Sequence, residues 1–516
     1  MGKFSRKNKQ CIFFLLALYI TVINSYSQES NESNMVMITP GTPFDTIIKK
    51  AAHVKPTPRQ VTWQELEFTS FVHFGLNTFY DREWGEKNYE ALRFNPSALN
   101  AGQWVRTAKM AGAKLLIIVA KHHDGFCLWP SKHTSFSLKN SPWKNGAGDV
   151  VGEVAEACRK QGIKFGVYLS PWDIHSPVYG TEEYNQYFKN QLRELLTNYG
   201  EISEVWFDGA CGEGPNGRKQ VYDWDGYFTL IRELAPNAVI AVMGPDVRWV
   251  GTETGYGRET EWSVVPASAA MMDDIAYGSQ QSETDGIFIP SDDLYKPDIG
   301  SRDKIRDAKG LIWYPSEVDV SLRPGWFYHK KEDSLVKSPK KLVDIYNASV
   351  GLNSVLLLNF SPDKRGLINR NDIQNVRGMR KILDKTFKNN LAKNASLRVD
   401  VVNIAYNAEH ITDNDPLTYW TPGIEKTTAT IEISLSKSKT FNRCVLQENF
   451  RNGQRVESFV LDVFQNGKWE KLTGGTTIGY KRILVFDDTN TQKVRLRILS
   501  SRDYPEISTF GLYKAP

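Results

Sequence analysis

Histidine, aspartate, tyrosine and tryptophan side chains stand at or just after the ends of several apolar runs in the first half of the chain. These runs cover residues 68–74, 114–120, 164–169 and 204–207. A packed core disfavours such side chains, whereas a rigid strand end can hold them in a fixed geometry for binding or catalysis. The set comprises His73, His122, His123, Asp124, Tyr168, Trp206 and Asp208.

Asp208 is the sharpest catalytic candidate, because it follows the run 204–207 directly and precedes Gly209. A carboxylate in that place can act as a nucleophile or as a general acid or base. The alternative is a helix-capping or turn aspartate. We favour the functional interpretation, with the carboxylate directed into a binding site.

His122 and His123 allow three interpretations: hydrogen bonding to a polyol, metal binding with Asp124, or a core histidine beside a solvent-facing neighbour. Adjacent strand residues point to opposite faces, and no further His or Cys cluster joins the pair. We therefore favour hydrogen bonding to a substrate rich in hydroxyl groups, and we expect no metal site.

Twelve of the fourteen tryptophans lie between Trp63 and Trp326. Most are candidates for core packing, but Trp84, Trp206 and Trp326 stand beside polar site candidates. An indole face packs well against the apolar face of a sugar ring. Together with carboxylates and histidines, this pattern indicates glycoside hydrolysis, which needs a second carboxyl group and no cofactor.

The elements that must position these residues alternate between strands and helices. Helices are expected over 101–111, 150–161, 182–198, 227–234 and 339–349, and strands over 238–243 and 354–359 as well as the first four runs. Strands that are apolar on both faces and joined by helices form parallel sheets. We expect a (β/α)₈-like barrel over residues 58–384, with 243–311 as enlarged loops. No nucleotide-binding glycine fingerprint follows a strand.

The pattern changes after residue 384. Residues 430–435 and 493–499 alternate with period two, and Asn466-Gly467 is typical of a hairpin turn. We expect residues 385–516 to form an antiparallel β-sandwich.

The N-terminus has the layout of a secretory signal peptide over residues 1–27, followed by an extended leader over 28–57. Four of the 64 basic residues precede the apolar run 12–23, so the remainder carries 60 basic against 59 acidic residues. This balance argues against a nucleic-acid or membrane-surface partner. The run is too short to span a bilayer, and we expect export to the periplasm or beyond the cell, without membrane insertion after cleavage. The four later cysteines leave room for one incidental disulfide.

Four motifs together resemble glycoside hydrolase family 29, the α-L-fucosidases: FVHFGLNTF at 71–79, KHHDGF at 121–126, YLSPW at 168–172 and VWFDGA at 205–210. The resemblance implies a retaining hydrolase acting on fucosylated oligosaccharides or glycoconjugates, with Asp208 as the nucleophile. It also implies fucose contacts from His73, Glu83, Trp84, His122, His123, Tyr168 and Trp206, to which we add Trp326.

The acid/base is expected in the loop 244–253, which resembles the family branch that prefers α-1,3/4-linked fucose and points to Glu253. Glu259 and Glu261 are the competitors. A raised pKa at Glu253 would suit proton donation to the leaving oxygen. Rival functions are another glycosidase, such as a galactosidase, and a non-catalytic carbohydrate-binding protein. The tail resembles a discoidin-like domain, which either binds a ligand or serves as a packing partner.

Overall fold

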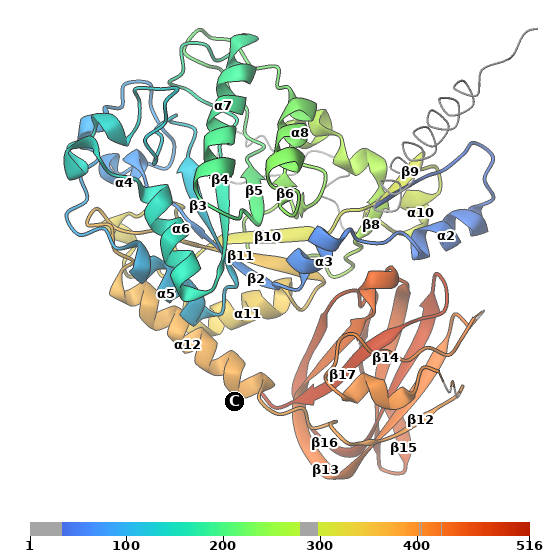
Figure 1. Ribbon diagram of the computed structural model, residues 1–516. Coiled ribbons are helices and arrows are strands. Elements are labelled where there is room, and N and C mark those ends of the chain that lie inside the picture. Colours follow the sequence, from blue (N-terminus) through green and yellow to red (C-terminus); the bar gives the residue numbers. More distant parts are fainter. Residues whose placement is uncertain (1–33, 279–297, 402, 404, 425) are drawn as a thin grey trace, which may run out of the picture.

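The computed structural model describes residues 34–278 and 298–516, apart from residues 402, 404 and 425 (Figure 1). The predicted signal peptide and the first residues of the predicted leader lie outside this part of the chain. None of the helices in the described ranges is both long enough and apolar enough to cross a membrane.

Eight parallel strands form one closed sheet. Strand β2, which comes first along the chain in this sheet, pairs with both β3 and β11. A parallel bridge between Ala241 and Val247 joins β6 to β7 at the two ends of the strand order. The predicted (β/α)₈-like barrel is confirmed. Its strands are β2 (Phe68–Val72), β3 (Leu115–Lys121), β4 (Lys164–Leu169), β5 (Glu204–Phe207), β6 (Val239–Val242), β7 (Arg248–Trp249), β10 (Ser316–Ser321) and β11 (Ser354–Phe360).

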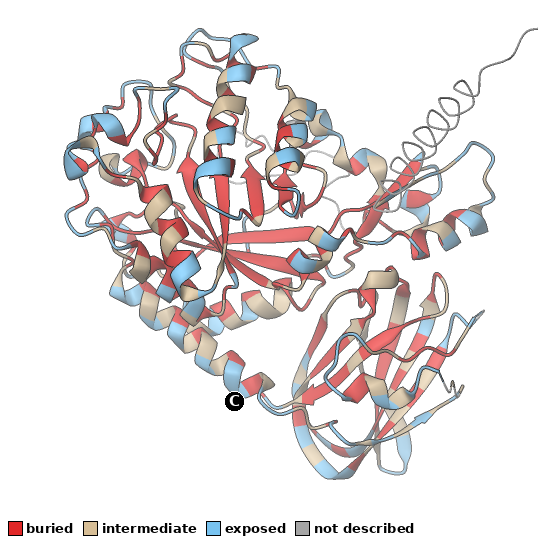
Figure 2. Ribbon diagram, in the orientation of Figure 1, coloured by how far each residue is buried: buried red, intermediate tan, exposed pale blue. Residues whose placement is uncertain are grey.

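Helices pack around the outside of this sheet, as the buried strands and the outward-facing exposed helix residues of Figure 2 show. The Asn100 side chain caps the first of them by accepting the backbone N–H of Gln103, and Gly112 ends it with φ 107°. A residue with a side chain rarely adopts that conformation, which explains the helix stop. The main helices are α5 (Ala101–Ala111), α6 (Val150–Gln161), α7 (Glu183–Asn198), α8 (Trp224–Leu234), α11 (Pro339–Ser349) and α12 (Arg370–Phe387).

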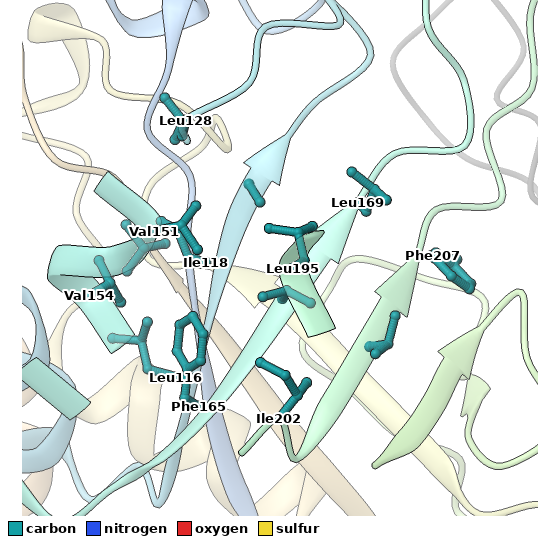
Figure 3. Close-up of a cluster of buried hydrophobic side chains, with 14 of the residues drawn as sticks. Leu116, Ile118, Leu128, Val151, Val154, Phe165, Leu169, Leu195, Ile202 and Phe207 are labelled. Atoms are coloured by element: carbon teal, nitrogen blue, oxygen red, sulfur yellow. The ribbon is translucent and has the colours of Figure 1, made fainter. Parts of the chain in front are cut away.

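Aliphatic and aromatic side chains fill the layer between the strands and these helices. Figure 3 shows Leu116 and Ile118 of β3 close to Val151 and Val154 of α6. Because each strand is buried on both faces, its backbone is held rigidly. The rim of the barrel therefore offers fixed positions for functional side chains.

The predicted extended leader is wrong for its described part. Strand β1 (Met35–Met37) pairs antiparallel with β9 (Gly310–Trp313), which also pairs with β8 (Val264–Pro266). Helix α2 (Phe44–Ala52) buries its apolar face against these strands and the C-terminal domain, a long-range packing that local polarity does not reveal.

The segment 243–311, which was predicted to form enlarged loops, contains the short strands β7 and β8. Shorter helices are α3 (Pro58–Gln64), α4 (Leu76–Tyr80), α9 (Met272–Gly278) and α10 (Arg302–Ile305).

The C-terminal domain is an antiparallel β domain around its own apolar core, as predicted. Asn466 and Gly467 both have positive φ and join two strands in the predicted hairpin. The strands are β12 (Ser396–Val399), β13 (Ala429–Glu448), β14 (Val456–Gln465), β15 (Lys468–Gly475), β16 (Arg482–Ser501) and β17 (Ile507–Tyr513).

This domain packs on the barrel segment 259–263. Thr477 Oγ1 accepts the backbone N–H of Glu261 at 3.1 Å, and Gln454 Oε1 accepts that of Ser263 at 2.7 Å. Gln454 Nε2 also donates to the carbonyl of Glu261 at 2.9 Å. The domain therefore braces the chain that follows the loop 244–253. The four cysteines in the described ranges are free, so the incidental disulfide is not formed.

Replacing Leu116 by alanine tests how strongly the barrel wall depends on this packing. Leu116 is fully buried, so we expect the variant to lose about 2–5 kcal/mol of unfolding free energy. Leu92 is 69% exposed and provides the matched control, for which we expect a loss within about 0.5 kcal/mol. Urea unfolding followed by tryptophan fluorescence measures both, and equal losses would contradict the proposed packing.

Candidate active site

A cavity of about 250 Å³ opens at the carboxyl ends of the barrel strands. This volume lies just below the range of roughly 300–1,000 Å³ typical of small-molecule sites, so it suits a single sugar ring rather than a long chain. Ten of the predicted site residues line it: His73, Glu83, Trp84, His122, His123, Tyr168, Trp206, Asp208, Glu253 and Trp326. Asp124 lies outside this lining, where its buried Oδ1 accepts the backbone N–H of Phe126 at 2.9 Å.

Asp208 follows β5 and presents a hydrogen-bonded carboxylate to this cavity. Its Oδ2 accepts the Tyr168 hydroxyl at 3.0 Å, and its Oδ1 accepts the backbone N–H of Ala210 at 2.7 Å. His123 Nε2 lies 3.8 Å from Oδ2. These bonds fix the carboxylate and stabilise its negative charge, while the side chain stays 26% exposed and reachable. Asp208 is thus suited to act as a nucleophile.

The three histidines are neutral groups, and hydrogen bonds orient the rings of His73 and His123. Burial lowers the pKa of His73 to about 4 and that of His122 well below its usual value, and it also lowers the pKa of His123. His73 Nδ1 donates to Asn359 Oδ1 at 2.8 Å, which leaves Nε2 as an acceptor. Neutral imidazoles with one donor and one acceptor suit recognition of hydroxyl groups.

His123 has a defined tautomer for the same reason. The Ser170 hydroxyl donates to the Trp172 carbonyl at 2.7 Å, so its oxygen is free to accept His123 Nδ1–H, also at 2.7 Å. Trp84 stacks on the His123 ring, with centroids 5.2 Å apart and planes 18° apart. In the part of the chain that the structure describes, no group of three or more His, Cys, Asp and Glu side chains could hold a metal ion.

Glu253 stands at the mouth of the cavity, where its side chain is open to solvent on one side and faces the cavity lining on the other. Its Oε2 accepts the indole Nε1–H of Trp326 at 3.1 Å. Desolvation raises the pKa of Glu253 to about 7, and the negative charges of Asp208 and Glu83 add to the rise. A carboxyl group with this pKa can donate a proton near neutral pH and accept one later in a reaction.

The two competing glutamates lie elsewhere. Glu261 is buried and forms ion pairs with Arg248 and Arg258, which hold its negative charge away from the cavity. Glu259 is largely exposed and pairs with Arg482 of the C-terminal domain. Of the three candidates, the structure brings Glu253 together with Asp208.

Glu83 lines the cavity, yet its carboxylate already has protein partners. Oε2 accepts the backbone N–H of Trp326 at 2.7 Å, and Oε1 accepts that of Phe327 at 3.2 Å. His329 Nε2 lies 2.6 Å from Oε1. Glu83 therefore anchors the loop that carries Trp326 as well as facing the cavity.

The sequence interpretation missed Asp319, a buried residue of β10 that lines the cavity. Trp249 Nε1 donates to its Oδ1 at 2.8 Å, and burial raises its pKa well above the usual value. The alternation of acidic residues and valines at 317–320 was the available signal, since it places Glu317 and Asp319 on one face of the strand. The other unpredicted lining residues are Phe71, Gly209, Ala210, Val242 and Trp249.

Known protein families match both domains of the chain. A family model described as α-L-fucosidase matches residues 49–386, and one described as F5/8 type C domain matches residues 395–510. α-L-Fucosidase 1 of Arabidopsis thaliana is 40% identical over 468 residues, which cover 89% of this chain and 87% of that protein.

Solved structures are similar to this chain over most of its length. A Bacteroides ovatus structure is 46% identical with a TM-score of 0.82, and the match covers 93% of this chain and 78% of that one. A Ruminococcus gnavus GH29 fucosidase, solved in complex with fucose, is 31% identical with a TM-score of 0.77. That match covers 90% of this chain and 95% of the fucosidase.

Proposed function

The chain belongs to the α-L-fucosidase family of glycoside hydrolases, and we propose that it releases terminal fucose by a two-step, retaining mechanism in the cavity at the barrel rim. Membership in this family favours the fucosidase over the two rival functions, a galactosidase and a non-catalytic sugar-binding protein. Fucosylated oligosaccharides or glycoconjugates are the substrates. The C-terminal domain belongs to the F5/8 type C family, in agreement with the predicted discoidin-like domain.

In the first step, an Asp208 carboxylate oxygen attacks the anomeric carbon of fucose while the bond to the leaving oxygen breaks. Glu253 gives its proton to that oxygen, so the aglycone leaves as an alcohol. In the second step, Glu253 takes a proton from water as the water oxygen attacks the same carbon. The ester bond to Asp208 breaks, and both carboxyl groups return to their starting states.

One observation carries this assignment: two carboxyl groups on one cavity have opposite environments. Asp208 receives two hydrogen bonds that stabilise the carboxylate, whereas Glu253 has a pKa raised to about 7. A retaining glycosidase needs this division between an ionised nucleophile and a protonated acid.

Neutral His73, His122 and His123 are proposed to bind the fucose hydroxyls, with Trp206 and Trp326 against the apolar parts of the ring. Tyr168 stacks on Trp206 at 5.2 Å and 22°, and Trp206 Nε1 donates to Glu317 Oε2 at 2.8 Å. These contacts fix the indole plane beside the sugar site. A rigid aromatic wall recognises a sugar with little loss of side-chain entropy.

The finer specificity and the location of the enzyme also belong to this proposal. Preference for α-1,3/4-linked fucose is supported by the resemblance of the loop 244–253, which carries Glu253. Export to the periplasm or the extracellular space is supported by the basic and apolar pattern of residues 1–27.

Replacing Asp208 by asparagine removes the nucleophile while keeping the shape of the side chain. We expect turnover of an activated aryl fucoside to fall by roughly 10³- to 10⁶-fold. Asp225→Asn, at an exposed position of α8, should keep full activity as the matched control. Near-normal turnover by Asp208→Asn would show that the nucleophile is assigned wrongly.

Glu253→Ala tests the acid/base. A good leaving group needs little protonation, so the variant should keep much more activity on an aryl fucoside than on a natural oligosaccharide, where the loss should reach about 10²- to 10⁴-fold. Added azide should restore turnover of the aryl substrate by replacing the activated water. Glu259→Ala and Glu261→Ala serve as comparisons. If one of them, and not Glu253→Ala, showed the leaving-group dependence and the azide rescue, that glutamate would be the acid/base.

The raised pKa of Glu253 predicts a pH dependence. Since the free enzyme needs Glu253 protonated, kcat/KM on a natural oligosaccharide should fall as the pH rises through about 7. The Trp326 indole stabilises the ionised form, so Trp326→Phe should raise the pKa of Glu253 and move this limb to higher pH. A pH–rate profile of both proteins measures the shift, and a limb that moves to lower pH would refute the assignment.

A further inference from the structure

The loop between β10 and α11 carries Trp326 to the cavity, and hydrogen bonds hold its backbone on both sides. Glu83 accepts the N–H groups of Trp326 and Phe327. The Trp326 carbonyl accepts Asn359 Nδ2–H at 2.8 Å and the Ser361 hydroxyl at 2.6 Å. The position of the Trp326 indole therefore depends directly on the position of the Glu83 carboxylate.

The approach of this loop to Glu83 is close as well as hydrogen-bonded. A β-carbon added at Gly325 would lie 2.5 Å from Glu83 Oε1, so no side chain fits there unless the carboxylate moves. From this position, Trp326 Nε1 reaches Glu253. A displacement of Glu83 would thus be passed to the hydrogen bond at the proposed acid/base.

His329 bonds two carboxylates at once. Its Nε2 lies 2.6 Å from Glu83 Oε1, and its Nδ1 lies 2.7 Å from Asp81 Oδ1. A histidine donates through both ring nitrogens only when it is protonated, and such charge-assisted bonds are stronger than neutral ones. His329 itself is buried, whereas the side chain of Asp81 is 59% exposed.

Asp81 is in turn fixed by the barrel. It ends α4 with φ 60°, and α4 comes soon after β2. Asn77 of α4 donates its Nδ2–H to the backbone carbonyl of Glu83 at 3.0 Å, which holds the intervening turn. The row Asp81, His329, Glu83 therefore runs from an exposed, anchored end to the cavity.

We propose that His329, held by Asp81, is a positioning residue for the reaction: it fixes Glu83, and through Glu83 and the Trp326 loop it fixes the acid/base Glu253. This inference rests on the proposed function, in which Glu253 protonates the leaving oxygen. Neither His329 nor Asp81 touches the reacting atoms in this scheme.

The charges around His329 agree with this role. The hydrogen bond to Glu83 raises the pKa of His329 to about 8, with a further contribution from Asp81 and from the negative charge of Glu332. The folded-state pKa of His329 exceeds the ordinary value of about 6.5. The stabilisation of the folded protein by protonated His329 is therefore complete below a pH of about 6.5 and is lost as the pH rises through about 8. Without the imidazolium, the charge of Glu83 would be less compensated and the Trp326 donor less well held. Both changes raise the pKa of Glu253.

His329→Gln tests the proposal. Glutamine is uncharged, so it cannot replace the imidazolium that donates to both carboxylates. We expect kcat/KM on a natural fucosylated oligosaccharide to fall by about 10- to 100-fold, as for a misplaced catalytic group. The loss on an activated aryl fucoside should be smaller, and the alkaline limb of the pH profile should move to higher pH. Asp81→Asn should change both readouts in the same direction by less.

His133→Gln is the matched control, since His133 faces Glu194 outside the cavity lining, with Nε2 3.7 Å from Oε1. It should leave both readouts unchanged. Equal losses on the two substrates with an unmoved limb in His329→Gln would overturn the proposal. If that variant does not fold, Asp81→Asn decides by the same two readouts. Failure of the proposed function would appear separately, as a lack of leaving-group dependence in Glu253→Ala.

Discussion

Hydrogen bonds from tryptophan indoles to carboxyl groups run through the interior of the barrel and reach the mouth of its cavity. Four of them connect Trp63 to Glu204, Trp206 to Glu317 and Trp249 to Asp319, each at 2.8 Å, and Trp326 to Glu253 at 3.1 Å. A buried carboxyl group without a donor is costly, and an indole supplies one donor together with a large apolar surface. Desolvation still raises the pKa at every one of these groups, to about 8 at Glu204 and about 7 at Glu253. Desolvation, which the indole bond only partly offsets, therefore leaves an acid at the mouth of the barrel.

The proposed nucleophile has a different environment on the same rim. Asp208 takes its donors from a backbone amide and the Tyr168 hydroxyl rather than from an indole. β5 places Asp208, whereas loops place Glu253, Glu83 and Trp326, which therefore depend on bonds to one another. The C-terminal domain adds a further constraint, because Gln454 and Thr477 hold the segment after the loop that carries Glu253. At this interface the domain acts as a packing partner.

Residues at the ends of regular strands could be predicted from the sequence. An apolar run and its last residue are neighbours along the chain, so His73, His122, His123, Tyr168, Trp206 and Asp208 could be placed at one rim once a parallel barrel was inferred. Asp319 was not predicted from the sequence, because β10 alternates acidic residues with valines and lacks the continuous apolar run that marked the other strands. The secondary structure of the leader was also missed, because β1 pairs with β9 more than 270 residues away and local sequence patterns do not reveal such a partner.

By itself, the sequence determined the fold class, the family and the candidate nucleophile, because periodicity, turns and short motifs are local properties of the chain. The tertiary structure decided which of three nearby glutamates reaches the cavity. Glu253, Glu259 and Glu261 lie within nine residues of one another. Yet Glu253 lines the cavity with Asp208, the exposed Glu259 pairs with the buried Arg482, and the buried Glu261 pairs with two arginines. The tertiary structure also raised the pKa of Glu253, because a pKa depends on burial and neighbouring charges that folding brings together from distant segments.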